Sequence, residues 1–442
     1  MAASGQDVLV DLPEPAPGAE APLASWLGWL ERGRGDHIDL GLERSREVAA
    51  RLGLQRPAPV VVTVAGTNGK GSSVALLEAV WRAAGYRVGA YTSPHLIRYN
   101  ERIRIDGSAV RDEPIRDAFA AVEAARGDVS LTYFEFATLA ALSLFERATL
   151  DVVILEVGLG GRLDAVNIVD ADVALIAAIG LDHEDWLGST REAIALEKAG
   201  IMRAGRPVVC SDHVAPATLV EHAATLGAEL HLIGADFAFE RSAAGWNWWN
   251  ARRLLEALPH PALDGLHQYR NAAGALATIE CLADRLPVDE AAIRSGLAGV
   301  VLHGRFERLA GDHEYVMDVA HNPQAAAIFA ATLATAPCSG RTHALVGMLR
   351  TKNHREYLRA LLGHVDCWHF TDLPGANGAR ATELADCLAS LDPRLGATCH
   401  PAVAQAHATI VAGAVPGDRV LVLGSFLTVG AMMGLLERQG PA

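Results

Sequence analysis

The stretch VVVTVAGTNGKGSSVALLEAV, residues Val60–Val80, decides the fold of this chain. Its first five residues are valines and one threonine, which is typical of a buried parallel strand. Three glycines and a lysine follow, and an apolar pattern with helical spacing begins at the serines. The usual phosphate-binding loop, G-x-x-x-x-G-K-[ST], has a glycine where Val64 stands and a hydroxyl directly after the lysine. The match is therefore partial.

The loop from Gly66 to Ser72 still suits a phosphate group. Glycines let successive backbone amides curl around phosphate oxygens, and the start of the following helix adds partial positive charge. Gly71 moves the hydroxyl one place along, to Ser72, but leaves those amides available. An ordinary strand-to-helix turn is the alternative. We interpret the segment as a phosphate-binding loop of another build.

Composition sets outer bounds on the protein. A chain of 442 residues, half of them hydrophobic, is expected to form two or three domains. The net charge of −14 argues against nucleic acid or an anionic membrane as a partner. No run approaches the ~20 apolar residues of a membrane span. Six separated cysteines without a C-x-x-C pair predict buried free thiols in a reducing cytoplasm.

Short apolar runs alternate with longer helical patterns, which predicts the α/β class with mostly parallel sheets. The expected strands of the first part are Val60–Val64, Arg87–Thr92, Asp151–Glu156 and Asp172–Ile179, and the expected helices are Ser73–Ala84, Phe134–Arg147 and Thr190–Ala199. The sequence RIRIDGSAV predicts a hairpin around Asp106-Gly107. WNWWN, Trp246–Asn250, predicts a second hairpin that packs its rings on the first domain.

The pattern starts again after a glycine-rich connection near residue 304. New strands are expected at Tyr315–Val319, Thr342–Gly347, Asp366–Phe370 and Arg419–Gly424. We therefore predict a disordered leader (1–22), an ATP-binding domain of P-loop type (23–303), a linker (304–311) and a smaller Rossmann-like domain (312–442). The leader carries acids and prolines and does not resemble a secretion signal.

Polar side chains follow the expected strands of the first sheet. Ser93, Glu156 and His183 come directly after three of them, and ligands of open parallel sheets bind at that edge. Glu156 ends an apolar strand and suits Mg²⁺, with a structural ion pair as the alternative. Taken singly, Ser93 is a turn hydroxyl, His183 a core histidine and Lys198 a solvated charge at a helix end.

At this point the residues match a known family. The motifs, in order, are VAGTNGKGS, SPHLIRYNERIRI, LTYFEF, LEVGLGGRLDAVNIV, LDHEDWLG, EKAGI, GRFE, DVAHNP and GSFLTVG. The chain resembles the bifunctional dihydrofolate synthase/folylpolyglutamate synthases of bacteria, within the Mur ligase superfamily. The resemblance runs from about Ala24 to about Leu436, and the folate assignment depends mainly on HIDLGLERS and LTYFEF.

The resemblance implies a nucleotide and metal site with Lys70, His183 and Lys198 as catalytic residues. The implied ATP contacts are Thr67, Asn68, Gly69, Lys70, Gly71, Ser72, Asn271, Arg305 and Asp318. Ser93 and Glu156 would bind a first Mg²⁺ and His183 a second. Lys198 matches a lysine that is carbamylated in this family, so that its new carboxylate helps to hold the second Mg²⁺.

The resemblance also implies the acceptor and its pocket. The implied pterin contacts are Asp39, Leu40, Gly41, Leu42, Thr132, Tyr133, Phe134, Glu135, Leu163, Asp164 and Ala165. The expected substrates are 7,8-dihydropteroate, folates, L-glutamate and ATP, and the expected state is a monomer. GMLRTKNH departs from the family's GM-x-x-D-K-D, so we assign no role to the loop Arg350–His354. For His321 a place near the nucleotide and a helix-start role are both open.

The implied reaction joins L-glutamate to dihydropteroate, and then to folate γ-glutamates, through an acyl phosphate. Another Mur-type ligase with a UDP-sugar-peptide acceptor and a monofunctional folylpolyglutamate synthase are the alternatives among enzymes. A nucleotide-dependent switch is the alternative from another class. The chain lacks the N-K-x-D motif expected of a guanine switch.

Overall fold

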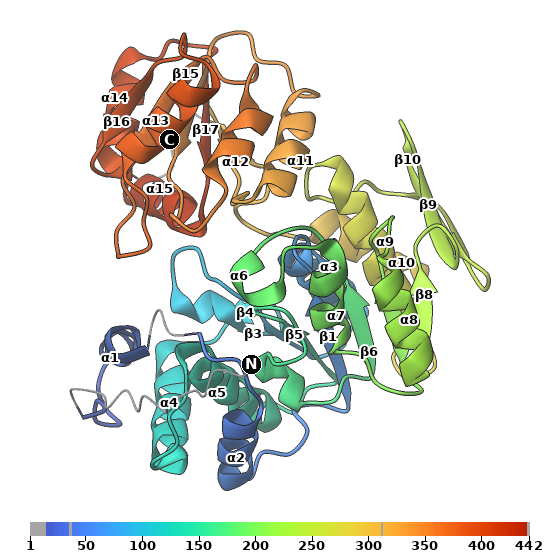
Figure 1. The fold of residues 1–442 in the computed structure, drawn as a ribbon. Coiled ribbons are helices and arrows are strands. Elements are labelled where there is room, and N and C mark those ends of the chain that lie inside the picture. The colour runs from blue at the N-terminus through green and yellow to red at the C-terminus, as the bar shows by residue number, and fades with distance from the viewer. Residues whose placement is uncertain (1–14, 35–37, 311–312, 440–442) are drawn as a thin grey trace.

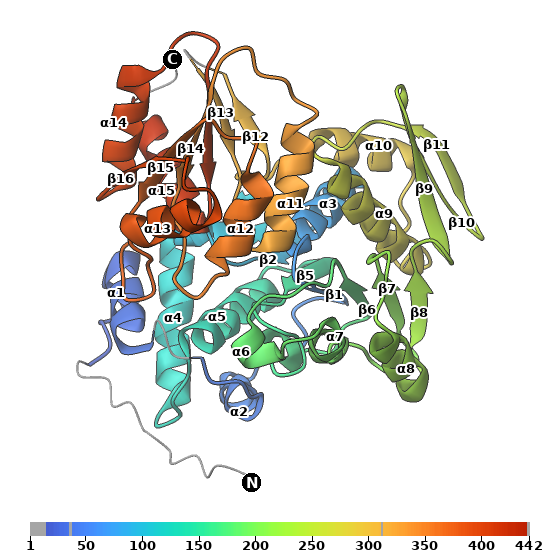
Figure 2. The same ribbon diagram turned by 45° about the horizontal axis from the view of Figure 1, so that its top comes forward.

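The computed structural model describes residues 15–34, 38–310 and 313–439. Figures 1 and 2 show two α/β domains, with a small β-ribbon at the side of the first domain. The predicted class is confirmed: an eight-stranded, mostly parallel sheet is followed by a smaller six-stranded sheet that is parallel except at one edge. No helix in the described part of the chain is long and apolar enough to cross a membrane.

The first sheet carries the phosphate-binding loop on a central strand. Its strands are β1 (Val60–Ala65), β2 (Val88–Tyr91), β3 (Ile103–Ile105), β4 (Ser108–Ala109), β5 (Val152–Glu156), β6 (Val173–Ile176), β7 (Pro207–Cys210) and β8 (Glu229–Leu232). They lie in the order β4-β3-β2-β5-β1-β6-β7-β8. Only the hairpin strands β3 and β4 run antiparallel to their neighbours. The carboxyl ends of β1, β2, β5 and β6 therefore meet at one edge.

Helices cover both faces of this sheet. One face packs against α1 (Leu23–Arg34), α2 (Glu43–Leu52), α4 (Asp112–Arg126), α5 (Tyr133–Arg147), α7 (Arg191–Ala199) and α8 (Ala217–Leu226), and the other against α3 (Lys70–Ala83), α9 (Leu266–Cys281) and α10 (Glu290–Gly299). Successive side chains of a strand point to opposite faces. Val61 accordingly packs in the first core, and Val60, Val62 and Val64 pack in the second. This is why β1 is apolar along its whole length.

The tryptophan-rich segment differs from the predicted two-stranded hairpin. It forms β10 (Gly245–Asn250), the central strand of a three-stranded antiparallel ribbon with β9 (Phe237–Ser242) and β11 (Leu254–Leu258). Trp246 and Trp248 are buried against the first domain, as expected, and the Trp248 ring nitrogen donates to the Ala273 carbonyl. Trp249 is on the opposite face of the strand and is exposed.

The second domain begins inside the segment predicted to be a linker. Its strands are β12 (Glu307–Leu309), β13 (Glu314–Met317), β14 (Thr342–Val346), β15 (Cys367–Thr371), β16 (Ala397–His400) and β17 (Arg419–Leu423), in the order β12-β13-β17-β14-β15-β16. Its helices are α11 (Pro323–Leu333), α12 (His354–Leu361), α13 (Ala381–Leu391), α14 (Val403–Gly413) and α15 (Phe426–Gln439). Because β12 pairs with β13, part of the segment 304–311 belongs to the second sheet.

Three further expectations need correction. Residues 1–14 of the predicted leader lie outside the described residues, but Ala16 and Ala21 pack against the first core. Helix α3 begins at Lys70, three residues before the predicted start, so Gly71 and Ser72 lie in its first turn. All six cysteines are free thiols, but only Cys210 is buried. Two short helical turns, α6 (Glu184–Leu187) and η2 (Ala165–Ile168), follow β6 and β5 and border the site.

Candidate active site between the two domains

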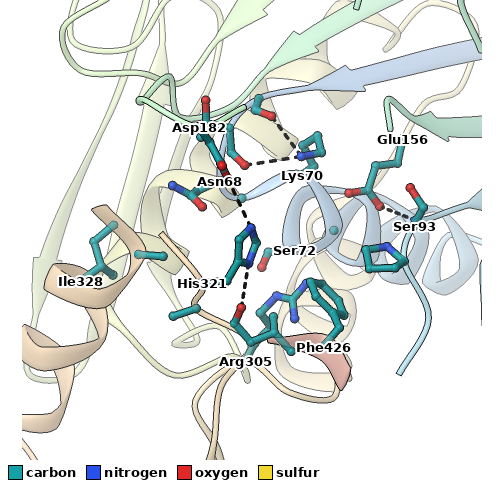
Figure 3. Close-up of a pocket in the computed structure, with 18 of the residues that line it drawn as sticks. Asn68, Lys70, Ser72, Ser93, Glu156, Asp182, Arg305, His321, Ile328 and Phe426 are labelled. Atoms are coloured by element: carbon teal, nitrogen blue, oxygen red, sulfur yellow. Dashed lines mark hydrogen bonds and ion pairs between the residues drawn. The ribbon is translucent and has the colours of Figure 1, made fainter. Parts of the chain in front are cut away.

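A cavity of 210 Å³ lies between the two domains, at the carboxyl edge of the first sheet. We call it the central cavity. The predicted site residues that line it are Thr67, Asn68, Gly69, Lys70, Gly71, Ser72, Ser93, Glu156, His183, Lys198, Arg305 and Asp318. Figure 3 shows Lys70, Glu156 and Ser93 on the first domain facing Arg305 and Phe426. Residues separated by up to 251 positions of the sequence (Thr67 to Asp318) thus share one cavity.

The phosphate-binding loop packs closely against the side chain of Asn271. Gly69 has φ +88°, and a Cβ there would lie 2.6 Å from Oδ1 of Asn271. Only glycine therefore fits this position. Asn271 itself packs behind the loop and does not line the central cavity. Since α3 starts at Lys70, the free amides of its first turn face the cavity, as an anion site requires.

Lys70 and Thr67 connect the loop to its surroundings. The Lys70 Nζ donates to the Gly66 carbonyl at 3.0 Å, which holds the ammonium over the loop. The Thr67 hydroxyl donates to the Gly180 carbonyl at 2.9 Å and accepts from the Gly180 amide at 3.0 Å. These bonds join the loop to the segment that leads from β6 to His183. The position of the loop is therefore coupled to that of the segment that carries His183.

Glu156 and Arg305 flank the start of α3. A Cβ on Gly71 would lie 3.4 Å from Nη2 of Arg305 and 3.9 Å from Oε2 of Glu156. Burial raises the pKa of the Glu156 carboxyl, and the positive charge of Lys70 opposes this. The Ser93 amide donates to Oε2 of Glu156 at 3.2 Å. Arg305 stacks on the Phe426 ring, with Cζ 5.1 Å from the ring centroid.

Asp318 supports the turn that carries Arg305. Its carboxylate accepts hydrogen bonds from the backbone amides of Phe306 at 2.8 Å and Ala320 at 2.7 Å. Burial raises the pKa of this carboxyl above its usual value, although the positive charge of Arg305 opposes part of that shift. Asp318 thus holds together the connection between the domains and the start of the DVAHNP segment. The same side chain also lines the central cavity.

His183 is held in an unusual backbone conformation, with φ 52° and ψ 41°. A histidine in the left-handed region is uncommon and marks a position worth testing for function. Burial, together with the positive charge of Lys352, lowers the pKa of His183 to about 4. The imidazole is therefore neutral at pH 7, which is the form that binds a metal ion.

Lys198 is almost completely buried at the end of α7, with 2% of its surface exposed. Burial lowers the pKa of its ammonium to about 7, with a further contribution from the charge of Lys70. A large fraction of Lys198 is thus a neutral amine near pH 7. The solvated helix-end charge that its sequence position suggests is wrong, because tertiary packing covers the side chain.

Contacts across the cleft involve residues to which the sequence assigned no role. Lys352 Nζ forms an ion pair with Oδ1 of Asp182 at 2.6 Å, and each side chain is 9% exposed. Asn68 of the phosphate loop donates to Gln324 at 2.8 Å and accepts from Asn322 at 3.1 Å. The second domain therefore contacts both the loop and the segment next to His183.

His321 also lies in the cleft. It lines the central cavity, and its Nε2 lies 3.4 Å from Oδ2 of Asp182 (Figure 3). Burial alone would raise the pKa of Asp182, but the hydrogen bond from His321 and the charge of Lys352 hold it well below its usual range. Asp182 is therefore a carboxylate that joins Lys352 and His321 of the second domain.

Lysine usage is the sequence signal that points to Lys352. The chain has 38 basic lysine and arginine side chains, and only Lys70, Lys198 and Lys352 are lysines. Two line the central cavity and the third pairs with Asp182, which lines it too. All other positively charged side chains of the chain, apart from histidines, are arginines. Lysine, which carries a compact ammonium on a flexible stem, occurs only at the cleft.

Replacing Lys352 by methionine should lower kcat/KM about 10²-fold. Removing one partner of a buried ion pair leaves the other charge uncompensated, at a cost of about 3–5 kcal/mol. Because Lys352 and Asp182 belong to different domains, this cost would destabilise the closed arrangement of the two domains. Steady-state kinetics, with small-angle scattering to follow domain closure, would measure the effect. Arg350→Met is the matched control, because Arg350 lies in the same loop but pairs with Glu383 of its own domain.

The predicted pterin residues lie next to the central cavity, on the side of α2, α5 and η2. Phe134 packs against Gly158, where a Cβ would lie 2.6 Å from the ring, and Gly158 lines the cavity. Thr132 and Glu135 form the capping box of α5. The Asp164 carboxylate accepts from the Leu159 amide at 2.9 Å, and Leu159 also lines the cavity.

Arg44 was missed by the sequence analysis and ties two of these segments together. Its guanidinium pairs with Asp39 and, at 3.0 Å, with Oε1 of Glu135. Glu135 is buried and already engaged with Arg44 and the helix cap. The Glu135 carboxylate thus stabilises the N-terminus of α5 and, through Arg44, the segment before α2. The position of Arg44 within HIDLGLERS is the signal that could have identified it.

The donor set around Glu156 fits a magnesium ion that is completed by a nucleotide. Within the described ranges, no three histidine, cysteine, aspartate or glutamate side chains are grouped closely enough to hold a metal ion by themselves. Mg²⁺ commonly takes one or two carboxylates and obtains its other ligands from phosphates and water. A buried Glu156 beside Ser93 and the phosphate loop meets that requirement.

Comparison with known proteins places this geometry in a family. A model of the Mur ligase middle domain matches residues 64–236, and a model of the Mur ligase glutamate ligase domain matches residues 304–426. The dihydrofolate synthase/folylpolyglutamate synthase of Escherichia coli K12 is 46% identical over 421 residues, which cover 95% of this chain and 97% of that protein. This chain belongs to the dihydrofolate synthase/folylpolyglutamate synthase family of Mur ligases.

Solved structures agree with this family membership. The structure of E. coli FolC in complex with DHPP and ADP is 45% identical, covers 96% of this chain and all of that chain, and has a TM-score of 0.90. A bifunctional folylpolyglutamate synthase/dihydrofolate synthase with Mn, AMPPNP and L-glutamate bound is 46% identical, with the same coverage and a TM-score of 0.88. The chain is an ATP-dependent glutamate ligase of this family.

Proposed function

We propose that this ligase joins L-glutamate to 7,8-dihydropteroate and then to the γ-carboxyl group of folates, through an acyl phosphate at the central cavity. The observation that carries the proposal is that the phosphate loop, Glu156, His183 and Lys198 line one cavity that both domains enclose. Phosphoryl transfer asks a protein mainly for alignment and charge neutralisation, and this set of groups supplies both.

The first step activates the acceptor. An oxygen of the acceptor carboxylate attacks the γ-phosphorus of ATP, the bond to the β-phosphate oxygen breaks, and ADP leaves with that electron pair. Lys70 and the amides of the first turn of α3 hold the phosphates in line, and Arg305 neutralises charge from the opposite side. Mg²⁺ ions, when bound, neutralise the phosphate oxygens, with Ser93, Glu156, His183 and a carbamylated Lys198 as their protein ligands.

The second step forms the amide. The amine of L-glutamate attacks the acyl carbon, inorganic phosphate leaves with the electron pair of the broken carbon–oxygen bond, and the amine loses a proton. An acyl phosphate is hydrolysed readily, so water must be kept out between the steps. The contacts of Asn68 and Asp182 with the second domain hold the domains together over the cavity.

Lys198 is proposed to carry a carbamate. Its neutral amine attacks carbon dioxide, a nitrogen–carbon bond forms, and the nitrogen loses a proton to leave an anionic carbamate. Burial supports this, since it lowers the pKa of Lys198 to about 7 and supplies the neutral amine. Carbamylation would give Lys198 a negative charge, so the repulsion between its ammonium and that of Lys70 would be removed.

The pterin ring is proposed to lie between α2, α5 and η2. The acceptor carboxylate would then enter the central cavity past Gly158 and Leu159, which contact Phe134 and Asp164 of the predicted pocket. Arg44 keeps the segments at Asp39 and Glu135 together. The pocket for the ring therefore lies on the first domain, whereas the reaction takes place in the cleft.

A coupled assay tests the function directly. With ATP, Mg²⁺ and L-glutamate, the release of ADP should require dihydropteroate or a reduced folate, and both acceptors should give stoichiometric amide product. Turnover with a UDP-sugar acid instead would overturn the folate assignment. Turnover with only one of the two acceptors would show a monofunctional enzyme, and ADP release without acceptor and amine would show a nucleotide switch.

A further inference from the structure

A second cavity, of 560 Å³, opens beside the central cavity and meets it at the reacting centre. We call it the side cavity. The residues that line both cavities are Gly71, Ser93, Pro94, Glu156, Arg305 and Phe426. Ligand pockets in proteins commonly have volumes of about 300–1,000 Å³, so the side cavity has the size of a binding site. The mechanism above does not use it.

Two arginines at the side cavity have no charged or hydrogen-bonded partner among the residues that the structure describes. Arg82 lies near the end of α3, and Arg98 lies in the loop between β2 and β3. Both are exposed, and neither guanidinium forms an ion pair or hydrogen bond within the described residues. A guanidinium offers five donors in a planar fork that suits carboxylates. Two unpaired forks on one cavity predict an anionic ligand.

Most of the remaining charged groups of the side cavity are already engaged. Arg104 pairs with Glu78 at 2.7 Å, and Glu101 accepts from the backbone amides of Leu96, Ile97 and Arg98 at 2.6–2.9 Å. His303 pairs with Glu307, and this hydrogen bond raises the pKa of the imidazole. Glu78 and Glu101 therefore have partners other than Arg82 and Arg98, and Glu437 is an exposed carboxylate of the same wall.

The Arg82 side chain lies close to the β3–β4 hairpin. Its guanidinium lies over Gly107, which has φ +77°, and a Cβ on Gly107 would lie 2.0 Å from Nη1 of Arg82. The glycine of the predicted Asp106-Gly107 turn thus makes room for the arginine as well as for the turn. The side chain thus lies next to the hairpin and also lines the side cavity.

The chemistry of a growing acceptor calls for space at this position. Dihydropteroate carries no glutamyl residue, whereas each completed cycle adds one residue and one α-carboxylate between the pterin ring and the reacting carboxylate. Even an α-linked residue lengthens an extended chain by about 3.5 Å, and a γ-linked residue has two more backbone bonds. The pterin pocket and the phosphate loop lie on one rigid domain, so added residues must leave the direct path.

We propose that the side cavity binds the γ-glutamyl residues already attached to a folate acceptor, with Arg82 and Arg98 pairing with their α-carboxylates. This inference rests on the proposed function. The side cavity joins the central cavity at Gly71 and Ser93, so a tail that bends out of the direct path enters it at once. Arg82 and Arg98 are then specificity-determining residues for acceptor length.

The test compares acceptors that differ only in the number of glutamyl residues. KM and kcat are measured for dihydropteroate, tetrahydrofolate and tetrahydrofolate triglutamate with the native chain, Arg82→Met, Arg98→Met and the double variant. Exposed charge pairs contribute up to about a fivefold change in affinity each. We expect KM for the triglutamate to rise about fivefold for each arginine removed, and KM for dihydropteroate to stay within about twofold.

Control measurements distinguish a failure of this inference from a failure of the proposed function. Arg252→Met removes an exposed arginine of the β-ribbon and should change no acceptor's KM. An unchanged triglutamate KM in the double variant, or an equal rise for all acceptors including dihydropteroate, would overturn the tail site. If the native chain converts neither dihydropteroate nor tetrahydrofolate, the proposed function itself fails. High salt should raise the triglutamate KM more in the native chain than in the double variant.

Discussion

Replacing Glu156 by glutamine should lower turnover by about 10²–10³-fold and raise the Mg²⁺ concentration needed for half-maximal rate. Metal ions contribute several kcal/mol of transition-state stabilisation in phosphoryl transfer, and about 1.4 kcal/mol corresponds to a factor of ten. Glutamine keeps the size of the side chain and removes its charge. Initial rates over a Mg²⁺ titration at saturating ATP would measure both effects.

Glu280→Gln serves as the matched control for this prediction. Glu280 pairs with Arg253 at 2.6 Å, on α9 near the β-ribbon, and has no contact with the central cavity. Its substitution should leave the Mg²⁺ dependence unchanged. Native Mg²⁺ dependence in the Glu156→Gln variant would remove Glu156 from the metal site and favour a purely structural carboxylate.

Replacing Lys198 by alanine should reduce turnover about 10²-fold, and short carboxylates such as acetate or propionate should restore part of it. The expected loss follows from removal of the proposed metal ligand, and a small carboxylate can occupy the space that the buried side chain leaves. Lys198→Arg should not recover activity, because a guanidinium does not form a carbamate. Turnover with and without added carboxylate at fixed pH would measure the rescue.

The small number of lysines makes the carbamate directly observable. In ¹³C-bicarbonate buffer, one carbamate signal is expected in the NMR spectrum of the native chain and none in Lys198→Ala. Lys70→Ala should also be inactive, but carboxylates should not rescue it. Native turnover in Lys198→Ala, or a spectrum without a carbamate signal in a fully active native sample, would contradict the proposal.

The sequence was informative where function depends on a short segment. The loop around Lys70 was recognised because a buried strand, glycines and a helix start occur within a few residues, and local backbone geometry then creates the anion site. Ser93, Glu156 and His183 were placed together by the rule that parallel strands end at one edge, and the structure brings all three into the central cavity. The bounds of helices and strands were less accurate, as the start of α3 at Lys70 shows.

The sequence was less informative where function depends on segments far apart in the chain. Asp182 and Lys352 are separated by 170 positions, and Asn68 and Asn322 by 254. Nothing in either local sequence indicates these pairs, because each depends on how the second domain lies over the first. A role for Lys352 could have been suspected only because lysine is scarce in the chain.

The sequence by itself determined the α/β class, the glycine-lysine loop between β1 and α3, and the edge of the sheet at which the proposed site lies. These depend on side-chain periodicity and on backbone geometry over a few residues. Tertiary structure alone decided which charges pair across the cleft and that Lys198 is a buried amine with a pKa of about 7. It also decided that Arg82 and Arg98 line a second cavity, with no partner within the described part of the chain. Burial and charge pairing depend on distances between segments remote in sequence, and only the folded chain fixes those distances.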